Sequence, residues 1–158
     1  MNAALGTAGV TLGLAASIIG ALTLAVGLRG RRAPLLRMGR SYAVLTLGGA
    51  VLAAFAMERA LLTHDFSLEY VAANGSRDTP LLYTVASLWA ALEGSIILWS
   101  LVLGGYLVAV VVRFRDRLSD PLVGWATLTM LVVSAFFFAL MLGPANPFTE
   151  VSGTVPLD

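Results

Sequence analysis

The sequence predicts an all-α integral membrane protein with four transmembrane helices. Hydrophobic residues make up 58% of its 158 residues and charged residues 12%, whereas a soluble domain has about 45–50% and about 25%. The charges are also unevenly spaced, since residues 1–28, 41–57, 94–112 and 121–149 carry none. An apolar helix of about 20 residues crosses the hydrocarbon layer, so four such stretches predict four spans.

The spans are expected at about residues 3–28, 41–62, 94–112 and 121–142 of a single membrane domain covering 1–158. The first stretch has no basic amino-terminal region and exceeds the roughly 7–15 apolar residues of a signal peptide, so we expect it to stay attached. Residues 64–92 are expected to form an outer segment. The last residues, 143–158, mix Pro, Gly and small polar residues and predict a turn-rich outer tail.

The third apolar stretch is too long for one simple span. A continuous helix over residues 81–112 would be about 48 Å long, which exceeds the roughly 30 Å hydrocarbon core. We therefore expect 81–92 to form a short helical segment at the outer surface. The sequence EGS at 93–95 would then mark the point where the chain enters the membrane.

Arginine placement predicts the orientation. All ten basic residues are arginine, and eight of them lie in two loops: Arg29, Arg31, Arg32, Arg37, Arg40, Arg113, Arg115 and Arg117. The intervening loop, 64–80, has one arginine and three acidic residues. The positive-inside rule places the arginine loops in the cytoplasm, which predicts an N-out, C-out topology. We expect these loops to contact membrane lipids, and the net charge of +1 predicts no nucleic-acid partner.

The first span carries small residues on one face. At about 100° per residue they share one stripe, which favours close packing against another helix. The stripe consists of Gly6, Gly9, Gly13, Ser17, Gly20 and Gly27, and Leu24 interrupts it before its last member. Whether the packing partner belongs to this chain is left open.

The residue types needed for a self-sufficient active site are missing. The sequence contains no cysteine and one histidine, His64, so neither a catalytic set nor a metal site is predicted within this chain. We favour a solvated, interfacial role for His64 over a ligand role. Glu58 and Arg59 lie near the outer end of the second span, where a structural role is favoured.

Glu93 is the acidic residue that composition does not explain. On a continuous helix, Trp89, Glu93 and Trp99 would share one face. One interpretation is an aromatic belt with an interfacial acid. The other is an acid that faces a partner, a cofactor edge or a proton path. The residues alone leave both interpretations open.

Three sequence segments together resemble a known family. They are DFSLEYVA at 65–72, LLYTVASLWAALEGSIILW at 81–99 and ANPF at 145–148. In order and spacing they are similar to the amino-terminal part of the CcmF branch of the CcmF/CcsA haem lyase family. The positions that carry the resemblance are Asp65, Phe66, Ser67, Tyr70, Val71, Ala72, Tyr83, Trp89, Glu93, Gly94, Ser95, Trp99, Asn146, Pro147 and Phe148.

The resemblance implies a role in cytochrome c-type biogenesis, as a membrane portion of a haem lyase that scaffolds haem presentation and attachment to apocytochrome c. The implied reaction joins haem vinyl groups to cysteine thiols as thioethers. The family's tryptophan-rich segment and haem-ligating histidines are expected beyond this chain, and His64 matches none of them. Whether the chain is itself an enzyme stays open, because it holds no complete active site.

The resemblance also implies contacts and a location. Candidate haem- or partner-contact residues are Trp89, Glu93, Trp99 and Asn146. Implied partners are the rest of the lyase or its other subunits, a haem delivery protein and apocytochrome c. The implied location is the bacterial inner membrane, with periplasmic outer loops. The alternative function is a non-enzymatic, four-span assembly or transporter accessory subunit that uses the small-residue stripe as its partner face.

Overall fold

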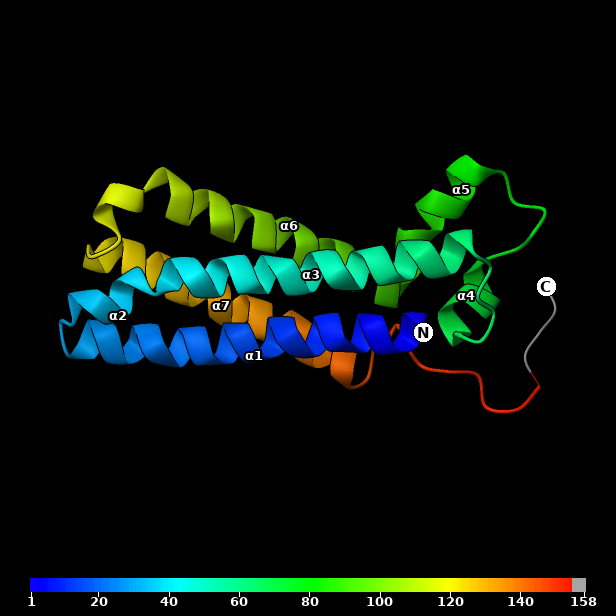
Figure 1. Cartoon of the computed structure of the whole chain (residues 1–158), viewed down its shortest axis with the longest axis horizontal. Coiled ribbons are helices and arrows are strands. Elements are labelled where there is room, and N and C mark those ends of the chain that lie inside the picture. Colours follow the sequence, from blue (N-terminus) through cyan, green and yellow to red (C-terminus); the bar gives the residue numbers. More distant parts are fainter. Residues whose placement is uncertain (155–158) are drawn as a thin grey trace.

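The computed structural model describes residues 1–154, so the last four residues of the predicted tail lie outside the described part. Four long helices run side by side (Figure 1): α1 (Asn2–Arg29), α3 (Gly39–Leu62), α6 (Leu92–Arg113) and α7 (Pro121–Leu142). Four helical segments are long and apolar enough to cross a membrane, the second formed by α3 with the short helix before it. The predicted all-α membrane fold with four spans is confirmed.

Shorter helices connect the long ones. They are α2 (Ala33–Arg37), α4 (Glu69–Asn74), α5 (Leu81–Ala86) and the 3₁₀ helices η1 (Ser87–Trp89) and η2 (Arg115–Arg117). Helices α5 and η1 confirm the predicted helical segment before the third span. This segment ends at Trp89, because Ala91 adopts an extended conformation (φ −129°, ψ 175°) and α6 then begins at Leu92. The assignment of one domain to residues 1–158 stays a prediction.

Local sequence explains where the long helices begin and end. Asp120 accepts a hydrogen bond from the backbone N–H of Leu122 at 2.9 Å and so caps α7, which starts with Pro121. Helices α1 and α3 both end in Schellman motifs. The left-handed position, which favours glycine, is occupied by Arg31 (φ 48°) after α1 and by His64 (φ 50°) after α3.

Helix α1 packs against both α3 and α7. The six small residues of its stripe are all buried: Gly6, Gly9, Gly13, Ser17, Gly20 and Gly27. A Cβ added at Gly9 would lie 2.7 Å from the backbone nitrogen of Ala53 in α3, and one at Gly13 would overlap the Phe138 ring of α7. The partners of the stripe described here therefore belong to this chain, and close van der Waals packing holds the helices together.

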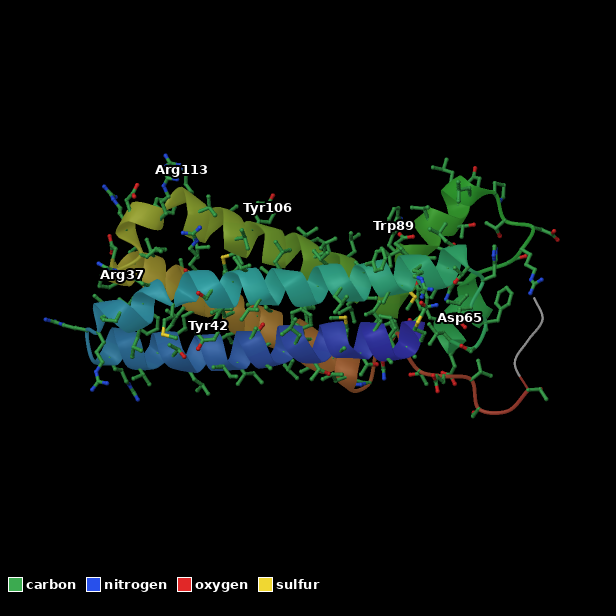
Figure 2. The ribbon with its side chains drawn as sticks, viewed as in Figure 1. Arg37, Tyr42, Asp65, Trp89, Tyr106 and Arg113 are labelled. Carbon is green, nitrogen blue, oxygen red and sulfur yellow. The ribbon has the colours of Figure 1, made fainter. Side chains whose placement is uncertain are left out.

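The two ends of the bundle differ in composition. One end holds the α1–α3 and α6–α7 connections with their eight arginines, and we call it the arginine end. Residues 64–91 and 143–154 cover the opposite end, and we call them the cap. Figure 2 shows Arg37 and Arg113 at one end and Asp65 and Trp89 at the other. This charge separation is the basis of the predicted orientation, which stays a prediction because the fold is the same in either direction.

Candidate functional site at the cap

The cap is built from two segments far apart in sequence. Residues 67–69 of the loop after α3 run beside residues 149–151 of the tail. The backbone N–H of Glu69 donates to the Thr149 carbonyl at 3.0 Å, and that of Val151 donates to the Ser67 carbonyl at 2.9 Å. Leu68 and Glu150 form an isolated antiparallel bridge. Backbone hydrogen bonds therefore join the loop to the tail within the cap.

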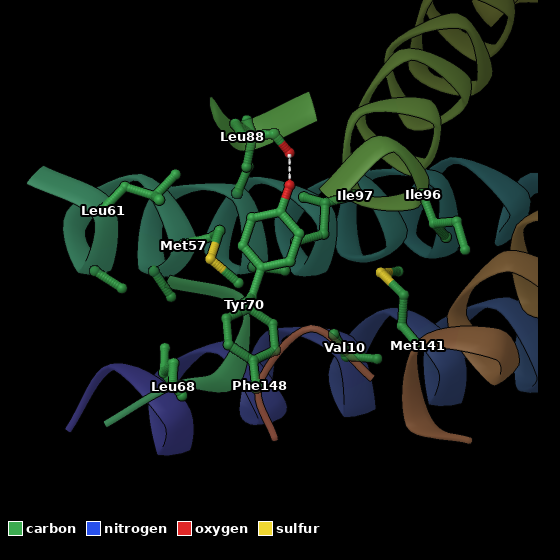
Figure 3. Packing of buried hydrophobic residues seen from close by; sticks show 14 of the residues in the cluster. Val10, Met57, Leu61, Leu68, Tyr70, Leu88, Ile96, Ile97, Met141 and Phe148 are labelled. Atoms are coloured by element: carbon green, nitrogen blue, oxygen red, sulfur yellow. Dashed lines mark hydrogen bonds between the residues drawn. The ribbon is translucent and has the colours of Figure 1, made fainter. Parts of the chain in front are cut away.

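Tyr70 of α4 anchors the segment before α6. Its hydroxyl lies 2.8 Å from the Ser87 carbonyl and 3.0 Å from the Leu88 carbonyl, and it accepts a weak hydrogen bond from the Ala91 N–H at 3.4 Å. Figure 3 shows the ring beside Met57 of α3, with its hydroxyl pointing toward the Leu88 carbonyl. Burial raises the pKa of Tyr70 above its ordinary value, and the nearby Glu93 charge adds to this increase. The phenol therefore remains a donor at neutral pH.

The structure explains why position 94, in the EGS sequence, is a glycine. A Cβ at this position would overlap the Leu88 carbonyl oxygen and the Tyr70 hydroxyl. The chain turns back on itself between η1 and α6, and only a residue without a side chain allows the two backbones to approach so closely. The first turn of α6 also carries Glu93, whose negative charge is favourable at a helix amino terminus.

A polar pocket of about 230 Å³ lies between α4, the start of α6 and the tail. It brings together two of the predicted candidates, Glu93 and Asn146. Its other lining residues are Glu69, Tyr70, Ala73 and Asn74. The Asn74 side-chain amide donates to the Tyr70 carbonyl at 3.0 Å, and the Asn146 side-chain oxygen accepts from the Phe148 N–H at 3.0 Å. The pocket therefore presents two carboxylates on a fixed backbone frame.

The two candidate tryptophans lie outside the lining of this pocket. Trp89 is 48% exposed and Trp99 is 60% exposed. The expectation that Trp89 and Glu93 share one helical face is wrong, because the chain is extended at Ala91 and the two residues belong to different helices. Both indoles instead point away from the protein core, as aromatic residues near a membrane interface do.

A hydrogen-bond network ties α1 to the cap. The Asn2 side-chain nitrogen donates to Asp65 Oδ2 at 2.7 Å, and Arg59 Nη1 donates to the Asn2 side-chain oxygen. The Ser67 hydroxyl donates to the other carboxylate oxygen of Asp65. The Ser67 hydrogen bond is the main cause that holds the pKa of Asp65 below its ordinary value, with burial opposing it and Asn2 supporting it. No local sequence signal predicts a network whose members are this far apart.

His64 is half-buried, and its expected interfacial role stays a prediction. Its Nε2 atom is buried and has no hydrogen-bond partner among the described residues. The ring lies 6.0 Å from that of Phe66. An axial haem ligand must present a ring nitrogen to an open face. The Nε2 atom of His64 is not presented in this way, and the left-handed backbone of His64 ends α3.

Comparisons with known proteins give a consistent answer. No family model matches the chain. It is 35% identical over 99 residues to the cytochrome c-type biogenesis protein CcmF of Pseudomonas fluorescens, covering 63% of this chain and 15% of that protein. It is 32% identical over 114 residues to CcmF of Escherichia coli strain K12, covering 72% of this chain and 17% of that protein. The Haemophilus influenzae CcmF matches all 158 residues at 27% identity, over 24% of its own length.

A solved structure named cytochrome c haem lyase CcmF superimposes with a TM-score of 0.85 at 34% identity, over 98% of this chain and 26% of that one. This chain is CcmF-like. The family resemblance from the sequence is therefore confirmed, and the CcmF-like chain spans about a quarter or less of the length of the curated relatives named above.

The CcmF-like fold suggests an involvement with haem, and the described residues test where haem would bind. The cap pocket, at about 230 Å³, is smaller than the roughly 300–1,000 Å³ of small-molecule pockets. Its two carboxylates, Glu69 and Glu93, would also repel the propionates of a haem. Among residues 1–154, no group of three or more His, Cys, Asp and Glu residues is placed to hold a metal ion. The cap pocket therefore does not fit a haem.

Proposed function

We propose that this chain is a membrane scaffold portion of a cytochrome c haem lyase, and that its cap helps to form the platform at which apocytochrome c meets haem. The observation that carries the proposal is the match over 98% of the chain to a solved cytochrome c haem lyase at 34% identity. The match has a TM-score of 0.85, so it covers the helix arrangement, and 34% of the aligned residues are also identical.

In the proposed reaction haem is a substrate. A cysteine thiol of apocytochrome c adds across a haem vinyl group, so that sulfur bonds to one vinyl carbon and the thiol hydrogen goes to the other. The groups that ligate haem would come from outside residues 1–154, because the cap pocket does not fit it and the buried Nε2 atom of His64 is not presented to it. This chain would contribute the rigid frame that positions the partners.

The cap pocket is suited to a partner's cationic or hydrogen-bond-donating groups. Glu69 and Glu93 supply carboxyl oxygens that accept hydrogen bonds, and Asn74 and Asn146 add amide groups beside them. Such a pocket attracts lysine or arginine side chains of apocytochrome c or of another lyase subunit. Within the proposal, Glu93 is therefore a partner contact and not a haem contact.

The proposal includes a location and an orientation. The cap would face the periplasm and the arginine end the cytoplasm of a bacterial inner membrane, as the arginine distribution favours. The partners would be the remainder of the lyase or its other subunits, a haem delivery protein and apocytochrome c.

The alternative, an accessory subunit that uses the small-residue stripe as its partner face, has lost its main support. The stripe packs within the chain: Gly6 against Phe148 of the tail, and Gly9 against α3. No other observation favours that alternative.

The experiment changes the chromosomal copy of the gene and measures c-type cytochromes by covalent haem staining. Deletion of residues 81–99 should abolish maturation, and Glu93→Gln should reduce it several-fold. Glu58→Gln, which removes the same charge from α3, is the matched control and should have a smaller effect. Chain abundance is followed by immunoblot so that loss of protein is recognised. Normal haem staining after the deletion would contradict the scaffold role. Equal effects of Glu93→Gln and Glu58→Gln would contradict the role of Glu93 as a partner contact.

A further inference from the structure

A second cavity lies at the arginine end, far from the cap. It has a volume of about 350 Å³ and lies between the end of α1, the start of α2 and the start of α7. Its rim carries Arg31 and Ser119, and its deeper wall is formed by apolar groups that include Leu28, Leu36 and Trp125. The cavity is therefore cationic where the chain leaves the membrane and apolar one helical turn further in.

The charged and apolar groups of the cavity are separated along the membrane normal by about the same distance as the phosphate and the first acyl carbons of a lipid. Trp125 follows Pro121 by four residues, so it lies about 6 Å deeper along α7 at about 1.5 Å per residue. The headgroup region extends roughly 5–7 Å beyond the hydrocarbon core on each side. A phosphate beside Arg31 would therefore place the glycerol and first acyl carbons beside the indole, which is 58% exposed.

The charge at this end favours an anionic lipid over a zwitterionic one. Eight arginines stand against two acidic residues, Asp116 and Asp120. Arg37 adds a second cation near the rim, because its Nε donates to the Ser119 hydroxyl at 3.1 Å. Arginine binds phosphate oxygens through paired N–H donors, and a surplus of cations attracts anionic headgroups.

The backbone holds Arg31 at the rim. The N–H of Arg32 donates to the Gly27 carbonyl at 2.8 Å, and the N–H of Arg31 lies 3.4 Å from the Leu28 carbonyl. This Schellman motif places Arg31 in the left-handed conformation (φ 48°), where glycine is the favoured residue. An arginine at this position forgoes that preference, and its exposed side chain is one of those that line the cavity.

We propose that this cavity is a binding site for one anionic phospholipid, with its phosphate on Arg31 and its acyl chain along Leu28 and Trp125. The proposal does not depend on the haem lyase function or on the orientation of the chain, since either membrane surface contains phospholipids. A free phosphate could use the arginine but not the apolar wall, so the experiment separates the two sources.

The experiment places the chain in lipid nanodiscs and measures quenching of Trp125 fluorescence by brominated lipids. Trp89→Phe and Trp99→Phe leave Trp125 as the sole tryptophan among the three in the sequence. Brominated phosphatidylglycerol should quench several-fold more than brominated phosphatidylcholine at the same mole fraction. Inorganic phosphate in excess should not relieve the quenching.

Arg31→Gly tests the site without disturbing the fold, because glycine adopts the left-handed conformation without steric strain. It should keep or raise the thermal midpoint and remove the preference for phosphatidylglycerol. Arg115→Gln removes the same charge from the same end, outside the cavity, and should keep the preference. Equal quenching by the two brominated lipids would overturn the proposal. So would an equal loss of the phosphatidylglycerol preference in Arg31→Gly and Arg115→Gln, or relief of the quenching by inorganic phosphate. If Arg31→Gly lowers the thermal midpoint, the Arg31→Lys variant is measured by native mass spectrometry. It should retain one bound phosphatidylglycerol, and loss of this lipid would overturn the proposal.

Discussion

The hydroxyl of Tyr70 lies 3.0 Å from the carbonyl oxygen of Leu88, and this contact joins the loop after the second span to the break before the third. The same hydroxyl reaches the Ser87 carbonyl at 2.8 Å. The Ser87 carbonyl also accepts from the Ala90 N–H at 3.2 Å, but the Leu88 carbonyl has no backbone donor among the described residues, because the chain becomes extended at Ala91. Tyr70 supplies the missing donor, so a side chain from α4 stabilises the entry into α6.

Tyr70→Phe should therefore destabilise the cap. The change removes the hydroxyl that donates to the Leu88 carbonyl, and a buried acceptor left without a partner costs about 1–3 kcal/mol. Hydrogen exchange measured by mass spectrometry should increase over residues 86–93. Tyr83→Phe is the control, since Tyr83 is 64% exposed and should show no change. Unchanged exchange in Tyr70→Phe would refute the anchoring role.

Gly94→Ala and Gly105→Ala should have opposite effects although both lie in α6. The Cβ at position 94 would overlap the Leu88 carbonyl and the Tyr70 hydroxyl, while a Cβ at position 105 meets nothing within 4 Å. We expect Gly94→Ala to cost more than about 2 kcal/mol, since backbone must move. Gly105→Ala should stabilise by about 0.5–1 kcal/mol through helix propensity. Thermal unfolding in detergent, followed by circular dichroism, measures both, and a harmless Gly94→Ala would disprove the close approach.

Gly49 and its neighbour Gly48 test the packing of α1 on α3. A Cβ at position 49 would lie 2.6 Å from the backbone nitrogen of Gly13 and 2.6 Å from the Gly9 carbonyl oxygen, while position 48 is open. Gly49→Ala should push the two helices apart and lower stability by about 1–3 kcal/mol. Gly48→Ala should be neutral or slightly stabilising. The same unfolding assay applies, and equal midpoints for the two variants would argue against backbone contact between α1 and α3.

Asp65 makes the stability of the cap depend on pH. Its pKa is lower in the folded protein than in the unfolded chain, so its contribution is present above the unfolded value and is lost as the pH falls through the folded value. Asp65→Asn should lower the thermal midpoint by a constant amount above about pH 5, and this difference should shrink below about pH 3.9. Asp116→Asn, at a side chain that is 91% exposed, serves as the control. A difference that grows as the pH falls would contradict the assignment.

The orientation is tested with single cysteines, because the sequence contains none. Asp78→Cys lies in the cap loop and Asp116→Cys in the loop between α6 and α7, and both positions are exposed. A membrane-impermeant maleimide added to intact cells should label position 78 and not position 116. Labelling of position 116 from outside would reverse the predicted topology.

Prediction from sequence succeeded where the membrane itself imposes the structure. A chain in hydrocarbon must pair its backbone polar groups internally, so uncharged stretches such as 41–57 and 121–149 indicate helices without reference to their neighbours. The helical segment before the third span was predicted for the same kind of reason, because a continuous helix over 81–112 would be too long for the bilayer. The position of its break was not predicted exactly, since that depends on Tyr70, which comes from another helix.

The sequence by itself determined the membrane class, the four helices, the segment before the third span and the family resemblance, because these follow from hydropathy, length and short motifs. Only the tertiary structure decided which surfaces meet. It placed Gly6 against Phe148, brought Glu93 and Asn146 into one pocket and separated Trp89 from the helix that carries Glu93. Such contacts join residues far apart in sequence, and their existence depends on close packing between helices, which no periodic pattern in a single helix specifies.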